Sequence, residues 1–378
     1  MDSGAYSDIY HETKTLNKTQ LLKLIKDCTI IEVASVLAGP AVGMFFAELG
    51  ARVIKIENPL TKGDVTRSWK LPVEDPDMDV SAYFASVNAG KEHVFLDLTS
   101  FEGQEKLHQL LGVADVLITN FKHGDSQKFG LEANVIREKY PKLIIGQIEG
   151  FTFEKNRTAY DVVMQAECGF MSINGEEDSG PLKMPVAFID ILAAHQLKEG
   201  ILLAYIDLAI SGKGSIVSVS LEDAALSSLA NQASNYLMTG HVPKLLGSLH
   251  PNIAPYGEVF NCKDGYTVIL AIGNDKQFQN FCELLQVPSR ELSPYVKNID
   301  RVENRENLAS LLEPYIRAMN RDDLMEKCHR KRIPIGAIRA LDEVLAKPAA
   351  KTLIWETIES GVTTKRMHSV AFRVKSNE

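Results

Sequence analysis

Two glycines and an acidic residue stand where a strand–turn–helix–strand unit could bind a nucleotide. Gly39 and Gly43 lie in the segment SVLAGPAVGMFFAELGARVIKIE (residues 35–57), and Glu57 ends its second apolar run. A dinucleotide-binding turn uses G-x-G-x-x-G, with an acid about 20 residues further on for the ribose. The acid is present, but the glycines are spaced G-x-x-x-G. We therefore expect Gly43 to permit close packing of helix and strand, and the turn at 36–40 to contact a ligand. The alternative for Gly39 is that it only caps the start of the helix.

Asp190 is a second candidate for chemistry. This carboxylate lies between an apolar run (residues 186–189) and the apolar start of a predicted helix (residues 191–194). Aspartate serves well as a helix N-cap, and the residue pattern alone favours that role. The residues alone therefore give Asp190 a structural role, with which a role in chemistry is compatible.

The elements that must position these residues form an alternating pattern. Strands this continuous in apolar residues, alternating with helices, indicate a parallel sheet covered on both faces. Pro40 and Gly50 mark the two ends of the first helix, and Thr99 with Glu102 forms a predicted capping box. The predicted strands cover residues 28–35, 52–57, 93–98, 114–121 and 142–151, and the predicted helices cover residues 40–49, 101–112 and 132–140.

The remaining pattern predicts further elements and a second domain. After Gly240 the residue pattern changes. Residues 250–273 contain turn residues between runs of alternating apolar and polar residues, which is typical of a hairpin. We predict an α/β fold with a Rossmann-like parallel-sheet large domain and a smaller α+β domain. The expected domains are a large domain (1–244), a small domain (245–335) and a return to the large domain (336–378). Other predicted helices cover residues 20–26, 192–210, 222–238, 276–285 and 303–319, and a further strand covers residues 214–221.

The charge, the apolar runs and the cysteine and histidine spacing count against several classes of partner and site. The 378 residues carry a net charge of −8, which does not favour nucleic acid or an anionic membrane. The N-terminal residues do not resemble a signal peptide, and no apolar run approaches the roughly 20 residues of a membrane span. The five cysteines are scattered and form no C-x-x-C pair, which fits a cytoplasmic protein. The nine histidines show no H-x-x-x-H spacing, so we expect no metal site.

Taken together, several blocks resemble the family III CoA-transferases, also called the CaiB/BaiF family. That superfamily includes formyl-CoA transferase, carnitine-CoA transferase and methylacyl-CoA racemase. The resemblance covers residues 28–345 and implies a two-domain chain that interlocks with a second copy as a homodimer. The blocks are VLAGPAVGMFFAELGARVIKIENP, GDVTR, YFASVNAGKEHVFLDL, ADVLITNFKHG, AYDVVMQAECGFMSINGEEDSGP, VAFIDILAAHQLKEGILLA, GKGSIVSVSLEDAAL and HPNIAPYGEVFNCKDGYTVILAIGNDKQF.

The resemblance implies that Asp190 is the nucleophile of a CoA transfer from an acyl-CoA donor to a carboxylic acid acceptor. Asp190 would form first a mixed anhydride and then an aspartyl-CoA thioester, with Tyr160 near the reacting thioester. Coenzyme A is then a substrate, and no tightly bound cofactor, metal or ATP is expected. Backbone N–H groups near Gly273 are candidates to stabilise the oxyanions. Around the nucleotide the family positions are Val36, Leu37, Arg67, Leu96, Asp97, Thr99, Asn120, Phe121, Lys122 and Lys128.

Three departures from the family pattern bear on specificity. Asn58 replaces an arginine of the formyl-CoA enzymes, Leu37 replaces a frequent glutamine, and no GGGG run follows Gly247. Formyl or oxalate specificity is therefore disfavoured. A 2-methylacyl-CoA racemase ranks lower, because Tyr160 stands where the racemases carry a histidine. A catalytically silent acyl-CoA-binding protein is a further alternative, and an NAD-dependent dehydrogenase is disfavoured by the missing G-x-G-x-x-G.

Overall fold

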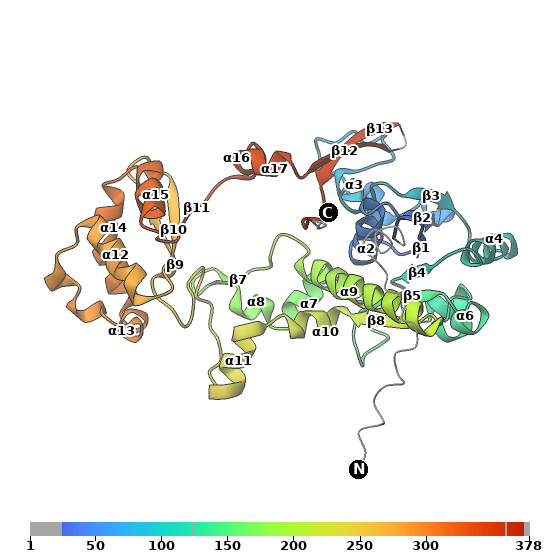
Figure 1. Ribbon diagram of the computed structural model, residues 1–378, viewed down its shortest axis with the longest axis horizontal. Helices are drawn as coiled ribbons and strands as arrows, with labels where there is room; N and C mark the ends of the chain where they lie inside the picture. Colours follow the sequence, from blue (N-terminus) through green and yellow to red (C-terminus); the bar gives the residue numbers. More distant parts are fainter. Residues whose placement is uncertain (1–24, 123, 360, 374–378) are drawn as a thin grey trace, which may run out of the picture. The chain divides into compact units, whose positions relative to one another are not determined.

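The computed structural model describes residues 25–122, 124–359 and 361–373 and divides into two compact units (Figure 1). The first unit comprises the described residues up to 168, residues 184–230 and those from 352 onward. The second unit comprises residues 169–183 and 231–351. Compactness does not show which part folds independently, so the boundaries at 244 and 335 stay a prediction.

A six-stranded sheet forms the centre of the first unit. Its order is β3-β2-β1-β4-β5-β8, and every pair of neighbouring strands is parallel. This confirms the predicted α/β class with a parallel sheet. The strands are β1 (Thr29–Val33), β2 (Arg52–Glu57), β3 (Glu92–Phe95), β4 (Val116–Thr119), β5 (Ile144–Glu149) and β8 (Ile216–Ser220).

Helices cover both faces of this sheet, as predicted. On one face Ile31 and Val33 share a core with α4 (Phe101–Leu111) and α6 (Ala133–Lys139). On the other face α2 (Ala38–Glu48) packs against α9 (Phe188–Ser211), and α9 lies along β5 and β8. The first unit also contains α3 (Ala82–Asn88), α5 (Asp125–Lys128), α7 (Asp161–Glu167), α10 (Leu221–Ser227) and the short helices η1 (Pro59–Thr61) and η2 (Val65–Ser68).

The C-terminal residues return to the first unit as an antiparallel hairpin. Strands β12 (Ile354–Glu359) and β13 (Val362–Met367) pair, and β13 packs against α3. Beyond β13, the backbone N–H groups of Ser369 and Val370 donate to the Glu48 carboxylate at the end of α2. These contacts join Ser369 and Val370 to the helix layer that covers the sheet.

The second unit is built on a small antiparallel sheet. Its order is β11-β10-β9, and β9 with β10 is the predicted hairpin. Helices α12, α14 and α15 cover it with an apolar core that includes Phe281 and Leu312. The elements are α8 (Phe170–Ile173), β6 (Gly175–Glu176), β7 (Gly180–Pro181), α11 (Ala230–Thr239), β9 (Tyr256–Asn261), β10 (Thr267–Ala271), α12 (Asp275–Leu285), η3 (Ser289–Glu291), η4 (Ser293–Tyr295), α13 (Asn298–Glu303), α14 (Arg305–Arg317), α15 (Arg321–Arg330), β11 (Ile335–Ala337), α16 (Leu341–Leu345) and α17 (Pro348–Lys351).

Several local predictions were wrong. The single helix expected over 222–238 is broken between α10 and α11, because Ala230 has a φ of 46°, which a continuous right-handed helix cannot contain. Ser100, and not Thr99, caps α4 by accepting from the Gly103 N–H. The expected helix at 20–26 lies almost entirely outside the described residues.

The first helix also begins earlier than expected. Leu37 is the N-cap of α2, so Gly39 is not the cap and Pro40 is the third helical residue. Gly39 instead leaves room for the preceding strand, because a Cβ there would lie 2.5 Å from Ala34 Cβ. Gly43 has the predicted packing role, since a Cβ there would lie 1.9 Å from Glu32 Oε2.

Candidate functional site

A pocket of about 220 Å³ lies at the carboxyl ends of β1, β4 and β5. This is the edge at which parallel α/β sheets bind ligands. Its walls are the segments 35–38, 119–122 and 147–151, which follow or end these strands, together with Ser126, Lys155, Arg157, Ala159, Tyr160, Asp190 and Leu221. We call it the aspartate pocket, because Asp190 lies in its wall.

Asp190 is the third residue of α9 and is only 8% exposed. Burial, followed by the negative charge of Asp161, raises the pKa of Asp190 to about 7. A carboxylate that loses its water shell is a stronger nucleophile and a costlier charge. The N-cap role considered for Asp190 is wrong, because the helix begins one turn earlier, with Ala187 as its N-cap.

Asp161 performs that capping role from a different helix. Its Oδ1 accepts the backbone N–H of Ile189 at 2.7 Å and that of Asp190 at 3.4 Å. Its Oδ2 accepts from Gln165 Nε2 at 2.6 Å, and Gln165 Oε1 accepts the Met184 N–H at 2.7 Å. Two residues of α7 therefore hold the segment that leads into α9, and this fixes the first turn on which Asp190 lies.

Tyr160 lies beside Asp161 and is 49% exposed. It lines the aspartate pocket. Lys155 and Arg157 line the same pocket, and both are paired with acids: Lys155 with Glu149, and Arg157 with Glu154 and Glu167. These two cations were not singled out in the sequence, although they directly precede the Tyr160 block.

A second and larger pocket, of about 860 Å³, adjoins the first and shares Ser35, Asn120, Phe121 and Lys122 with it. We call it the outer pocket. Its wall includes Leu96, Asp97 and Thr99. Thr99 donates from its N–H and its hydroxyl to Asp97 Oδ1 at 2.9 and 2.6 Å, and these bonds lower the pKa of Asp97.

The structure thus brings most of the expected site residues into two adjoining pockets, with Val36, Leu37, Tyr160 and Asp190 in the aspartate pocket alone. Lys128 lies outside both walls, with its Nζ 5.3 Å from the ring centre of Phe129, which lines the outer pocket. Gly273 belongs to the second unit, where its N–H donates to Gln277 Oε1. The roles assigned to all these residues stay predictions.

Arg67 lines the outer pocket, but its guanidinium forms an ion pair with the Glu57 carboxylate. Its Nε and Nη2 donate to the two Glu57 carboxylate oxygens at 2.7 and 2.5 Å, and its guanidinium lies 3.8 Å from the Phe84 ring centre. Burial opposes ionisation of Glu57, but hydrogen bonds from Arg67, His93 and the Asp64 N–H hold the pKa of Glu57 far below its usual value. Glu57 is therefore fully paired and is not available to bind a ribose.

Two further searches of the described residues give simple results. No helix in 25–122, 124–359 or 361–373 is both long and apolar enough to cross a membrane. Within the same ranges, no group of three or more His, Cys, Asp and Glu side chains is arranged to hold a metal ion.

Comparison with known proteins identifies the class to which this fold and site belong. The sequence description of CoA-transferase family III matches residues 25–378. The chain is similar to the succinate–glutarate CoA-transferase of Agrobacterium fabrum, with 38% identity over 84% of this chain and 81% of the relative. It is also similar to the human succinyl-CoA:glutarate CoA-transferase, with 31% identity over 86% of this chain and 74% of the relative.

A solved structure agrees with these sequence matches. The crystal structure of a CaiB/BaiF family protein from Brucella suis superimposes with a TM-score of 0.80 and 36% identity, covering 93% of this chain and 92% of that one. The chain belongs to CoA-transferase family III, as the sequence blocks predicted.

Proposed function

We propose that this protein transfers CoA from a donor acyl-CoA to an acceptor carboxylic acid, with Asp190 as the covalent nucleophile. The observation that carries the proposal is the position of Asp190, a nearly buried carboxylate in the wall of the aspartate pocket on a helix turn held by Asp161. A carboxylate of that kind is poised to attack an electrophilic carbonyl.

The first half of the reaction loads CoA onto the enzyme. An Asp190 carboxylate oxygen attacks the thioester carbonyl, the carbon–sulfur bond breaks, and CoA leaves as a thiolate. The product is a mixed anhydride between Asp190 and the donor acyl group. The thiolate then attacks Cγ of Asp190, the anhydride C–O bond breaks, and the donor leaves as a free carboxylate. Asp190 is now a CoA thioester.

The second half repeats these steps in reverse with the acceptor. The acceptor carboxylate attacks Cγ of the aspartyl thioester and expels the CoA thiolate, which gives a second anhydride. The thiolate attacks the acceptor carbonyl, forms the acceptor thioester and restores the Asp190 carboxylate. One thioester is consumed and one is formed, so the sequence balances without an outside energy source.

We further propose that the donor acid and the acceptor acid are both dicarboxylic acids. The donor would be succinyl-CoA, and the acceptor would be a five-carbon acid of the glutarate type. The names of the Agrobacterium and human relatives support this choice, as do two Haloarcula relatives named succinyl-CoA:mesaconate CoA-transferases. A second carboxylate needs a cation. Lys122, Lys155 and Arg157 in the aspartate pocket are the candidates, and Lys155 and Arg157 would exchange their surface acid partners for the substrate.

We also propose that the protein is a cytoplasmic homodimer. Large apolar side chains on two helices support an interface: Leu237 and Met238 of α11 are 78% and 85% exposed, and Leu203 and Ile210 of α9 are 67% and 78% exposed. Large exposed apolar side chains in such numbers indicate surfaces that a partner covers. Size-exclusion chromatography with light scattering should give twice the 41.8 kDa chain mass. A monomeric mass in dilute solution would contradict the homodimer.

The activity is tested with purified protein, succinyl-CoA and glutarate. We expect glutaryl-CoA and succinate in equal amounts, and no transfer by Asp190→Asn. A second assay, with a 2-methylacyl-CoA in deuterated water, examines the racemase alternative. Incorporation of deuterium at the α-carbon without CoA transfer to any acid would contradict this proposal and favour a racemase. Binding of CoA without either reaction across a panel of acids would favour a silent acyl-CoA-binding protein.

A further inference from the structure

Val36, in the turn between β1 and α2, has an unusual backbone. Its φ is 71°, in the left-handed region that a β-branched residue rarely occupies. Such a conformation persists only where its surroundings hold it, and it concentrates at functional sites. Val36 lines the aspartate pocket, directly before Leu37, the N-cap of α2.

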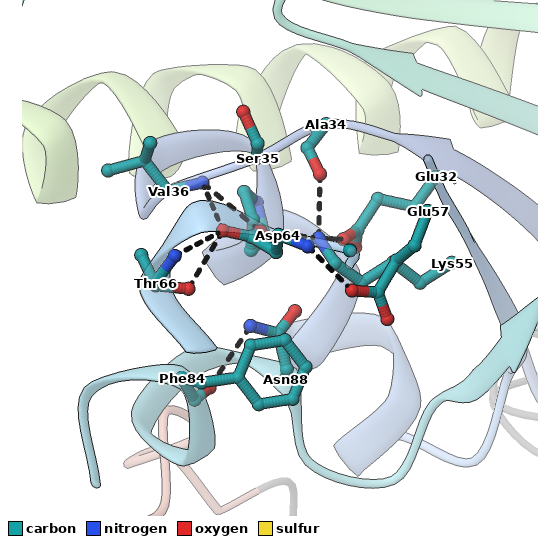
Figure 2. A network of polar contacts seen from close by, with 12 residues as sticks. Glu32, Ala34, Ser35, Val36, Lys55, Glu57, Asp64, Thr66, Phe84 and Asn88 are labelled. Atoms are coloured by element: carbon teal, nitrogen blue, oxygen red, sulfur yellow. Dashed lines mark hydrogen bonds and ion pairs between the residues drawn. The ribbon is translucent and has the colours of Figure 1, made fainter. Parts of the chain in front are cut away.

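One buried carboxylate holds this residue in place. The Val36 N–H donates to both oxygens of Asp64, at 3.3 and 3.2 Å (Figure 2). Asp64 is 5% exposed and is the N-cap of η2, where its Oδ1 also accepts the N–H and the hydroxyl of Thr66 at 3.0 and 2.8 Å. Its own N–H donates to Glu57 Oε2 at 2.8 Å. Asp64 is therefore fixed independently of Val36.

The two residues before Val36 are held by other elements. Lys55 Nζ, on β2, donates to the Ala34 carbonyl at 2.6 Å. Asn120, which follows β4, accepts the Ser35 N–H at 3.0 Å and donates to the Ser35 carbonyl at 2.7 Å. Three side chains from three parts of the sheet edge thus determine three consecutive backbone positions, of which the last is strained.

A buried set of charges fixes Asp64 in turn. Lys55 Nζ lies 3.0 Å from Asp64 Oδ2 and 3.0 Å from Glu32 Oε1, and Lys91 Nζ lies 2.7 Å from Glu32 Oε2. All four side chains are at most 1% exposed. Lys55 lies between Glu32 and Asp64 in Figure 2. Two acids and two lysines balance one another away from water, where removal of one partner leaves a costly unpaired charge.

We propose that Asp64 is a positioning residue, which keeps the Val36 turn left-handed and so places Val36 and Leu37 in the wall of the aspartate pocket. Its effect on catalysis rests on the proposed function, because the pocket must bind the acyl-CoA for the turn to matter. Because position 36 is a valine and not a glycine, the turn carries backbone strain and an apolar residue lines the aspartate pocket. Through Asp64, residues 63–67 thus hold the backbone turn that forms part of the wall of the aspartate pocket.

The test compares Asp64→Ala in two backgrounds, wild type and Val36→Gly. Without the carboxylate, we expect a valine at position 36 to leave the left-handed region and a glycine to remain in it, because glycine adopts positive φ without strain. Asp64→Ala should therefore lower kcat/KM by about 100-fold with Val36 and by no more than about 10-fold with Gly at that position. Thr66→Val is the matched control, because it removes a hydrogen bond to Asp64 that does not involve Val36, and it should lower kcat/KM by less than about threefold.

Crystal structures of the same variants separate this inference from the proposed function. They report φ at position 36 whether or not the protein transfers CoA. If Asp64→Ala does not fold, Asp64→Leu keeps the approximate size of the side chain and removes both acceptor oxygens, and the same comparison applies. A left-handed Val36 in the variant, or an equal loss of kcat/KM in both backgrounds, overturns the proposal. So does a relaxed turn with unchanged kcat/KM.

Discussion

Asp161 Oδ1 accepts the backbone N–H of Ile189 at 2.7 Å and that of Asp190 at 3.4 Å, so one carboxylate caps the helix that carries the other. The two acids have opposite tasks. Asp161 accepts hydrogen bonds from backbone N–H donors, which suits the positive end of a helix. Its negative charge adds to burial in raising the pKa of Asp190 to about 7.

The first prediction concerns the pH dependence of transfer. Asp190 must be ionised to attack, so kcat/KM should rise with pH and level off above about 7. Asp161→Asn removes the charge that raises this pKa, so the rising limb should move to lower pH. Loss of the charged cap should also lower the plateau by about 10-fold.

Asp207→Asn is the matched control for that experiment. Asp207 is an exposed acid on the same helix, 17 residues after Asp190 and thus about 25 Å along its axis. At that separation its charge is screened at physiological salt. A limb that stays in place in Asp161→Asn, or that shifts equally in both variants, would show that Asp161 does not tune Asp190.

The second prediction concerns stability. The pKa of Asp190 is raised from 3.8 to about 7 on folding, so the folded state binds more protons than the unfolded state between these values. The contribution of Asp190 to the free energy of unfolding is therefore most favourable at low pH, and it decreases as the pH rises through that window. Three pKa units correspond to at most about 4 kcal/mol.

Asp190→Asn removes this titration. We expect the variant to exceed the wild type in free energy of unfolding by about 2–4 kcal/mol at pH 8 and by much less at pH 5. Urea unfolding at the two pH values measures the difference. A variant that is less stable than the wild type at pH 8 would mean that the Asp190 charge is favourably paired.

The third prediction tests the packing role of Gly43. A Cβ at this position would lie 1.9 Å from Glu32 Oε2, inside the buried charge set. Gly43→Ala should lower the free energy of unfolding by about 1–3 kcal/mol in urea. Gly112→Ala is the control, because its Cβ would meet nothing closer than 3.4 Å and its φ is −64°. Equal effects of the two changes would reject the packing explanation.

The fourth prediction separates two basic residues of the outer pocket. Arg67 forms a two-point pair with buried Glu57, whereas Lys122 is exposed at the boundary of both pockets. Arg67→Lys should lower the free energy of unfolding by about 2 kcal/mol, because a lysine cannot form the two-point pair, and should leave the Kd for CoA nearly unchanged.

Lys122→Ala should give the converse result: a Kd for CoA about 10-fold weaker, with unchanged stability. Calorimetric titration with CoA and urea unfolding measure both quantities. If Arg67→Lys weakens CoA binding and leaves stability intact, Arg67 contacts a phosphate and its pairing with Glu57 is secondary.

The sheet was predictable because its strands are buried on both faces and read as continuous apolar runs. Charges inside those runs were a further signal that went unused: Glu32 and Lys55 interrupt β1 and β2, and a charge in a buried strand needs a partner. Asp161 could not be assigned its role from local sequence, because the N–H group that it caps belongs to Ile189, 28 residues later. The break at Ala230 depends on backbone conformation, which alanine does not signal.

The most direct test is the intact mass of the protein after incubation with an acyl-CoA donor. We expect a covalent adduct of CoA on Asp190 that hydroxylamine removes, located by peptide mapping and absent from Asp190→Asn. An adduct at another residue, or undiminished transfer by Asp190→Asn, would contradict the account.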